Sequence, residues 1–255
     1  MKFPTQTLIE NFFNVGIGGF NNAVGDLISG LFHYCASTSS CSQLAPNLPT
    51  QLYGIDIPVL ITQKEEKQSE KLVVILGQDP YRNPTDQYFK TAGAYINPPY
   101  KGEKATIIGT PYAYHLTNSI IPTSNIKYSA TRFMADLIGK IHEEKGYDVY
   151  LTDLSKLFAC GHTINQMFGK RKNPGFEDSS LCLLKKELDC LGAMGYSDIV
   201  VLCSGKGVYK RVPTTVARKL KFFYHFTSGR ALGYWKKQIG SSTPEDKINH
   251  IVSQI

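Results

Sequence analysis

The chain has 255 residues, enough for one large domain with a full hydrophobic core, and no linker-like stretch requires a second domain. Lys and Arg outnumber Asp and Glu by 28 to 21, and the formal net charge of +7 suits a polyanionic partner. Residues 1–10 lack the apolar core of a signal peptide and no run approaches a membrane span, so we expect a soluble, intracellular protein, cytoplasmic or, in a eukaryote, nuclear, with no membrane partner.

Residues 1–65 are expected to form a helical N-terminal layer of a single domain, 1–255. Apolar residues recur at helical spacing over 8–13 and 23–34. The glycine-rich stretch between these two segments follows no strand and precedes no Lys-Ser or Lys-Thr pair. It therefore does not fit a phosphate-binding loop, and this part of the chain indicates little about function.

The run 72–76 is apolar throughout, which is typical of a strand buried on both faces of a parallel sheet. Gly77 and Pro80 end the run, and Asp79 stands between them. Open α/β sheets bind their ligands at the carboxyl ends of such strands, so Asp79 is a candidate functional residue. The alternative is that Asp79 only caps a turn.

An aromatic residue and a rigid segment follow this loop. Tyr95 is closely followed by Pro98 and Pro99. A tyrosine ring beside a functional loop can stack on a planar ligand, or it can simply pack within the protein. The stretch 103–128 is expected to be irregular surface structure.

The rest of the chain alternates helices with short apolar strands. Such alternation predicts the α/β class, with a central four-stranded, mainly parallel sheet between two layers of helices in a three-layer α/β/α arrangement. In chain order we expect a helix over 130–145, a strand over 148–152, a loop over 158–175, a helix over 180–192, a strand over 198–203 with a short helix after it, and a strand over 220–224.

Four loops should meet at one edge of this sheet, because parallel strands end on the same side. They carry residues 78–81, Asp153, residues 204–206 and His225. A lone histidine at a strand end is usually hydrogen-bonded structure. The expected position of His225 at the same sheet edge as Asp79 favours a functional role for this histidine.

A basic segment lies near the carboxyl terminus, between Asp198 and Glu245, where the chain has no acidic residue. Aromatic residues are interleaved with its cations, as expected for a nucleic-acid partner, although an ordinary solvated basic face has the same charge. The cations are Lys206, Lys210, Arg211, Arg218, Lys219, Lys221, Arg230, Lys236 and Lys237, and the aromatics include Tyr209, Phe222, Phe223, Tyr224, Phe226, Tyr234 and Trp235.

The six cysteines show no C-x-x-C pair and no zinc-type spacing. A metal or iron–sulfur site is therefore not expected, and we expect no cofactor. Cys182 and Cys203 lie in apolar runs and are interpreted as small buried hydrophobic residues, the usual state of a free thiol in a reducing compartment.

The motif Gly-Gln-Asp-Pro-Tyr at 77–81 resembles the first motif of the uracil-DNA glycosylase superfamily, closest to the branch in which it reads GQDPYH. A glycine–aromatic–proline segment, a Thr-Asp-Leu strand end, a strand with Ser-Gly-Lys and a final strand ending in His follow at matching distances, over roughly 72–235. The resemblance implies a small parallel sheet between helices. It also implies a monomer that acts in base-excision repair: it flips uracil out of single- or double-stranded DNA and hydrolyses its glycosidic bond without a cofactor.

The resemblance assigns roles around the scissile bond, where an oxocarbenium-like sugar and a uracil anion develop. Asp79 would orient the water and oppose the positive sugar, and His225 would donate a hydrogen bond to uracil O2. Gln78 would offer backbone contacts to the base, Tyr81 would exclude the methyl group of thymine, and Tyr95 would lie against the flipped ring. The implied DNA-binding residues are Pro98, Pro99, Ser204, Gly205, Lys206, Ser228 and Arg230.

Asp153 departs from the family pattern, which has a base-reading asparagine at this position. An ionised carboxylate could accept from uracil N3–H but would face O4 with a like partial charge. Reading uracil would require a protonated Asp153, hence a buried one with a raised pKa, or Thr152 or a water in its place. A cytosine-like edge, which has an exocyclic amine, is the alternative substrate.

The last motif departs as well, because Gly229 replaces the leucine that wedges into the vacated base stack, and a glycine cannot push. Arg230 or Leu232 could take over that role. In the first motif, Arg82 replaces the histidine with which the family motif ends. Two functions therefore stay open: an active DNA glycosylase, or a non-catalytic nucleic-acid-binding protein that keeps the fold.

Overall fold

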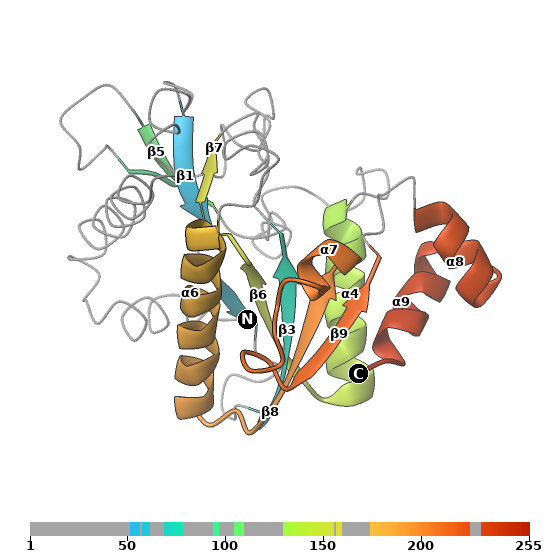
Figure 1. Ribbon diagram of the computed structural model, residues 1–255. Coiled ribbons are helices and arrows are strands. Elements are labelled where there is room, and N and C mark those ends of the chain that lie inside the picture. The colour runs from blue at the N-terminus through green and yellow to red at the C-terminus, as the bar shows by residue number, and fades with distance from the viewer. Residues whose placement is uncertain are drawn as a thin grey trace.

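The computed structural model describes nine stretches of the chain, which contain two β-sheets and five helices (Figure 1). The described residues are 52–56, 58–61, 69–78, 94–96, 105–109, 130–155, 157–159, 174–224 and 231–255.

The larger sheet has five strands in the order β2-β6-β3-β8-β9. Its four parallel strands are β3 (Lys71–Gly77), β6 (Asp148–Asp153), β8 (Asp198–Ser204) and β9 (Lys219–Phe223), and β2 (Val59–Ile61) runs antiparallel to β6 at the other edge. The four predicted strands are thus confirmed within one or two residues at their ends. The predicted strand number was wrong for this sheet, because β2 is a fifth strand.

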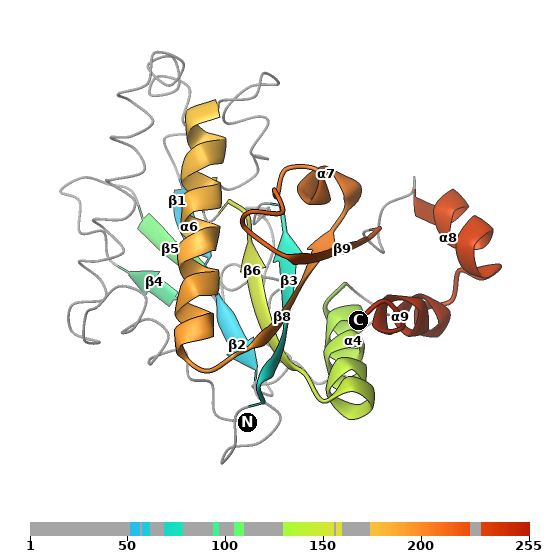
Figure 2. The same cartoon turned by 60° about the horizontal axis from the view of Figure 1, so that its bottom comes forward.

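Helices cover both faces of this sheet, as the sequence predicts. α4 (Ala130–Lys145) and α9 (Pro244–Val252) pack on one face, together with α8 (Ala231–Ile239). α6 (Pro174–Ala193) and the short α7 (Lys206–Tyr209) pack on the other. Figure 2 shows α8 and α9 beside α4, with α6 on the opposite side of the strands. The helix α4 has the predicted bounds, whereas α6 begins six residues before the predicted start at 180.

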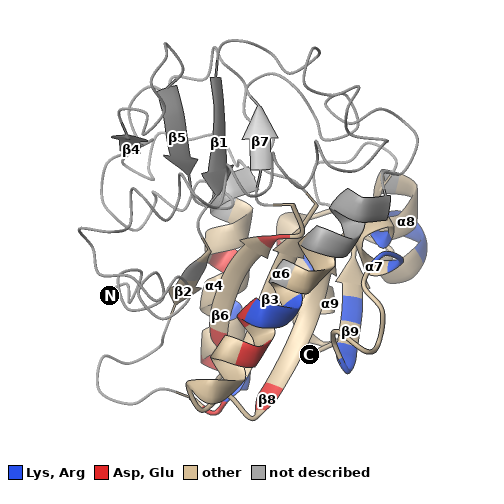
Figure 3. Ribbon diagram, turned by 60° about the vertical axis from the view of Figure 1, so that its left-hand side comes forward, with Lys and Arg blue, Asp and Glu red and all other residues tan. Residues whose placement is uncertain are grey.

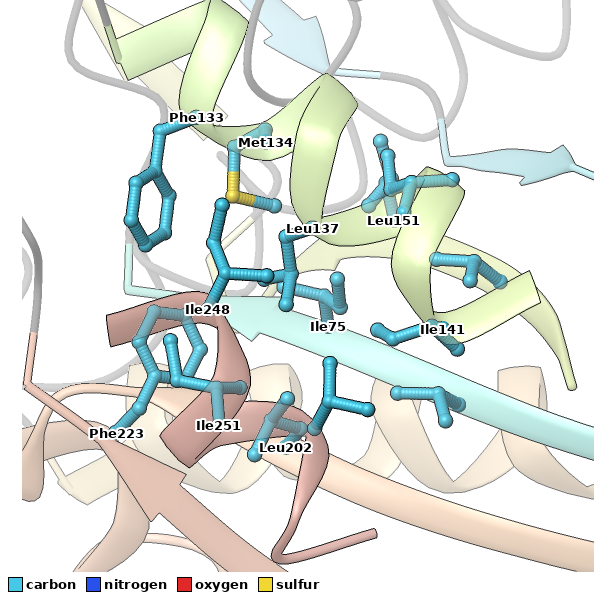
Figure 4. Packing of buried hydrophobic residues seen from close by; sticks show 14 of the residues in the cluster. Ile75, Phe133, Met134, Leu137, Ile141, Leu151, Leu202, Phe223, Ile248 and Ile251 are labelled. Carbon is cyan, nitrogen blue, oxygen red and sulfur yellow. The ribbon is translucent and has the colours of Figure 1, made fainter. Parts of the chain in front are cut away.

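The core forms because β3 is apolar on both faces. Val73 and Ile75 face α4, Leu72, Val74 and Leu76 face α6, and all five are fully buried. Figure 4 shows side chains of α4 and α9 meeting above β3 and β8. Burying one such aliphatic side chain contributes roughly 1.5–3 kcal/mol, so the central strand is fixed firmly in the sheet.

The smaller sheet has the strand order β4-β5-β1-β7. The strands β1 (Leu52–Asp56) and β5 (Ala105–Gly109) run parallel, and β4 (Ala94–Ile96) and β7 (Leu157–Ala159) pair antiparallel with β5 and β1.

Three sequence predictions are wrong at these strands. The helical layer over 1–65 contains the strands β1 and β2, and the irregular stretch 103–128 contains β5. The loop over 158–175 includes part of β7 and the first two residues of α6. Hydrophobic periodicity cannot identify strands of three to five residues, because so short an apolar run also fits other structures. The remaining parts of these predictions lie outside the described residues.

Every helix in the described ranges is too short or too polar to cross a bilayer.

Candidate functional site

The structure describes five of the predicted site residues in full: Gln78, Asp153, Ser204, Gly205 and Lys206. Of Tyr95 it describes only the backbone, which belongs to β4. The predictions for Asp79, Tyr81, Pro98, Pro99, His225, Ser228 and Arg230 lie outside the described residues.

The four parallel strands end at one edge of the sheet, as predicted. Gly77 pairs with Asp153 on one side, and Leu76 pairs with Cys203 on the other, which places Ser204 level with Gly77. Ser204 in turn pairs with Phe223 at the end of β9. Asp153, Gly77, Ser204 and Phe223 thus form one row across four strands, which we call the edge row.

Asp153 and Ser204 point to the same face of the sheet. Side chains alternate along a strand, and the neighbours two residues back, Leu151 and Leu202, both belong to the core cluster under α4. Both side chains are nearly buried, with exposed fractions of 5% for Asp153 and 9% for Ser204. Two strand spacings of about 4.8 Å separate them, and Gly77 between them contributes no side chain.

The Ser204 hydroxyl is buried and has no hydrogen-bond partner among the residues that the structure describes. Most buried hydroxyls in proteins are paired, because an unpaired one costs about 1–3 kcal/mol. Ser204 therefore keeps a donor and an acceptor unused at the edge row. A ligand oxygen placed beside β8 could take this hydrogen bond.

The loops after β3 and β6 are joined by backbone hydrogen bonds. The Leu154 N–H donates to the Gly77 carbonyl at 2.9 Å, and the Ser155 N–H donates to the Gln78 carbonyl at 3.0 Å. These bonds extend the sheet ladder beyond the strand ends. They hold the chain after Asp153 against the segment that leads directly into Asp79.

Gln78 lies on the other face from Asp153 and Ser204. Its side-chain Oε1 would lie 3.9 Å from a Cβ atom added at Gly207, in α7. Its carbonyl accepts from Ser155, so one of the two lone pairs of this oxygen is already engaged.

The turn after β8 depends on Gly205, whose φ of 115° is a conformation that other residues rarely adopt. Its N–H donates to the Cys203 carbonyl at 3.0 Å, and its own carbonyl accepts from Tyr209 at 3.1 Å. The reversal leaves Lys206 exposed at the sheet edge. A cation at this place is consistent with the predicted phosphate contact.

A buried acid supports the strand that carries Asp153, and sequence reasoning missed it. Glu187, in α6, is 1% exposed and accepts hydrogen bonds from the Tyr150 hydroxyl at 3.2 Å and the Thr152 hydroxyl at 3.1 Å. Burial, together with the Glu187 carboxylate, raises the pKa of Tyr150 well above its usual range. The sequence feature that could have indicated this buried acid is its place on the helix, beside the apolar stripe of Leu184, Leu188 and Leu191.

Thr152 cannot take the place of Asp153 in reading a base. Its hydroxyl is engaged by Glu187 on the α6 face of the sheet, and its side chain is fully buried. Asp153 itself points to the α4 face. Of the two side chains considered for base reading, only Asp153 is therefore directed to the same face as Ser204.

The cysteines have mixed surroundings. Cys203 is buried as predicted, and burial raises the pKa of its thiol to about 12, which makes it unreactive. The prediction for Cys182 was wrong, because this residue is exposed: it lies off the stripe by which α6 contacts the sheet. In the part of the chain that the structure describes, no group of three His, Cys, Asp or Glu side chains could hold a metal ion.

Comparisons of the chain with protein-family models, with curated proteins and with solved structures found no match.

Proposed function

We propose that the protein is a DNA glycosylase that hydrolyses the N-glycosidic bond of a flipped-out deaminated base, in the first instance uracil. The observation that carries the proposal is the edge row, which brings Asp153 and the unpaired Ser204 hydroxyl to one face of the sheet. In the sequence, Asp79 comes two residues after Gly77 and His225 two residues after Phe223. Both proposed catalytic groups thus directly follow strand ends that belong to the row.

The chemistry requires these groups on opposite sides of the scissile bond. Water adds to C1′ of the sugar while the bond from C1′ to the base nitrogen breaks, and the electron pair leaves with the base. In the proposed site, Asp79 orients the water and stabilises the positive sugar, and His225 donates a hydrogen bond to O2 of the departing anion. The remaining proton of the water passes to solvent.

Asp153 would read the polar edge of the base, and Ser204 would donate to a phosphate oxygen beside the flipped nucleotide. A carboxylate accepts hydrogen bonds but donates none unless it is protonated. Under this proposal a neutral Asp153 donates to uracil O4, and an ionised Asp153 favours a base with an exocyclic amine.

The direct test is a cleavage assay with four otherwise identical oligonucleotides that contain uracil, cytosine, thymine or hypoxanthine. We expect abasic product from uracil, and Asp79→Asn should reduce its rate by about 100-fold or more. Asp189→Asn, an exposed change on the outer side of α6, is the matched control and should cleave normally. No abasic product from any of the four bases at high protein concentration would exclude the glycosylase.

A non-catalytic nucleic-acid-binding protein is the second candidate function, and the identity of Asp153 favours it. A carboxylate at the base-reading position fits uracil less well than the asparagine of the family that the sequence resembles. This candidate predicts salt-dependent DNA binding that Asp79→Asn does not weaken. Abasic product that disappears in Asp79→Asn would exclude it.

A further inference from the structure

Four aromatic rings form a continuous row around the end of the edge strand β9. Tyr209 in α7 contacts Phe222 in β9, with ring centroids 5.0 Å apart. Phe222 contacts Tyr224 at 5.6 Å, and Tyr224 contacts Tyr234 in α8 at 4.1 Å. All four side chains are partly exposed. We call Tyr209, Phe222, Tyr224 and Tyr234 the aromatic row.

The aromatic row passes from one face of the sheet to the other. Tyr209 and Phe222 pack against the core cluster under α6, and Tyr224 and Tyr234 pack against the cluster under α4. All four side chains are only partly buried, so some ring surface stays accessible. The row also borders the candidate site, because Phe223, between Phe222 and Tyr224, pairs with Ser204.

Exposed lysines that make no ion pair within the described part of the chain lie on or next to the elements that carry the aromatic row. They lie on all three elements that carry it, and Figure 3 shows basic residues on β9, α7 and α8. Asp198 lies at the opposite, amino-terminal end of the parallel strands β8 and β9, where it is bound to Lys219 at 2.6 Å. The unpaired lysines are Lys206 and Lys210 in or next to α7, Lys221 in β9, and Lys236 and Lys237 in α8.

The combination of accessible rings and unpaired cations indicates which class of ligand would bind here. A polyanion with flat apolar faces matches both features, because its phosphates pair with lysines and its bases stack on tyrosines. Duplex DNA keeps its base faces inside the helix, so it could use the lysines but not the rings. A folded acidic protein has no regular series of planar groups to match a row of rings.

We propose that the aromatic row is a stacking platform for single-stranded DNA that leads to the edge row. This proposal rests on the proposed function, which identifies the polymer as DNA. In it, the unpaired lysines bind the phosphates of the strand. It further implies that single strands bind better than duplexes of the same sequence, because only single strands present their bases to Tyr224 and Tyr234.

Fluorescence anisotropy with a labelled thymidine oligonucleotide of about 16 nucleotides tests this platform, since that length covers a large single-strand binding site. The probe contains no uracil, so binding is measured separately from excision. Tyr224→Ala and Tyr234→Ala should each weaken binding by about 5- to 150-fold, because one base–aromatic stack is lost. Tyr224→Phe and Tyr234→Phe keep the ring and should bind almost like the native protein.

Surface variants keep the test valid if an alanine variant does not fold. Lys221→Gln and Lys236→Gln change exposed side chains, so they should fold, and each should reduce the slope of log affinity against log salt by about 0.7. Lys185→Gln, on the outer side of α6, is the matched control and should leave the slope unchanged.

Three results would overturn the platform: equal affinity for single strand and duplex, native-like binding by folded Tyr224→Ala and Tyr234→Ala, or an unchanged salt slope in both lysine variants. If uracil is excised while the tyrosine variants bind normally, the platform is wrong and the proposed function stands. If the tyrosine variants lose binding but no base is excised, the platform stands and the proposed function is wrong.

Discussion

Asp153 and Ser204 lie level with each other at the carboxyl edge of the sheet, point to the same face, and have only Gly77 between them. One is a buried acid and the other a buried hydroxyl without a partner. The buried Ser204 hydroxyl costs folding energy, which a protein usually accepts only where a ligand will use the polar group.

Asp153→Asn should increase the excision of uracil. The asparagine amide donates to O4 and accepts from N3–H without a change of protonation, so kcat/KM for a uracil oligonucleotide should rise by about 10-fold, the value of one correctly paired buried polar group. Steady-state kinetics of the native protein and the variant measure this effect. An unchanged or lower kcat/KM for uracil would mean that Asp153 does not read O4.

Ser204→Ala should leave the protein as stable as before or slightly more stable. The substitution removes a buried hydroxyl that makes no hydrogen bond, whereas Thr152→Val removes one that is bound to Glu187 and should cost about 1 kcal/mol. Urea denaturation of both variants gives the comparison. In the cleavage assay Ser204→Ala should raise KM more than it lowers kcat, and a native KM would show that Ser204 does not contact DNA.

Glu187→Ala should lower the free energy of unfolding by about 2–4 kcal/mol, because it leaves the buried Tyr150 and Thr152 hydroxyls without their acceptor. Glu187→Gln keeps an acceptor oxygen and should cost less. Asp189→Ala, two residues along the same helix, is exposed and should change stability by less than about 0.5 kcal/mol. Equal losses in Glu187→Ala and Asp189→Ala would contradict the supporting role of the network.

Acid should weaken the fold at the amino-terminal ends of β8 and β9. The Lys219 ammonium, 2.6 Å from Asp198, lowers the pKa of this carboxyl below its ordinary value, and the Tyr147 hydroxyl adds a hydrogen bond at 3.0 Å. A lowered folded-state pKa means that the stabilisation is present above the ordinary pKa and is lost as pH falls through the folded one. Tm measured from about pH 7 to about pH 3 should therefore decline less in Asp198→Asn than in the native protein, and parallel declines would contradict this assignment.

The sequence predicts the larger sheet well, because the parallel strands β3, β6 and β8 are largely buried on both faces, and β3 appears as the apolar run 72–76. The helix α4 is predicted with equal success because its apolar residues have a clear helical period. The strands β1, β2, β5 and β7 are too short for any period, and their pairing joins segments far apart in the chain, as between β1 and β5. No local pattern carries that information.

The candidate site divides in the same way. The position of Asp153 at a strand end follows from the chain order, since parallel strands share one edge. The unpaired hydroxyl of Ser204 and the engagement of Thr152 by Glu187 depend on packing between α6 and β6, which sequence spacing does not reveal. From the sequence, the aromatic row could be predicted only as a segment rich in aromatic residues. The ring contacts that join Tyr209 to Tyr234 are seen only in the structure.

The most direct test of the central claim is to incubate the protein with a uracil-containing single strand. Mass spectrometry then quantifies both the free base that is released and the abasic strand that remains. The native protein should give free uracil and abasic strand in equal amounts, and Asp79→Asn should lower both by about 100-fold or more while binding the strand normally. Release that is equally fast in the native protein and in Asp79→Asn, or no release from either, would contradict a glycosylase built on this edge of the sheet.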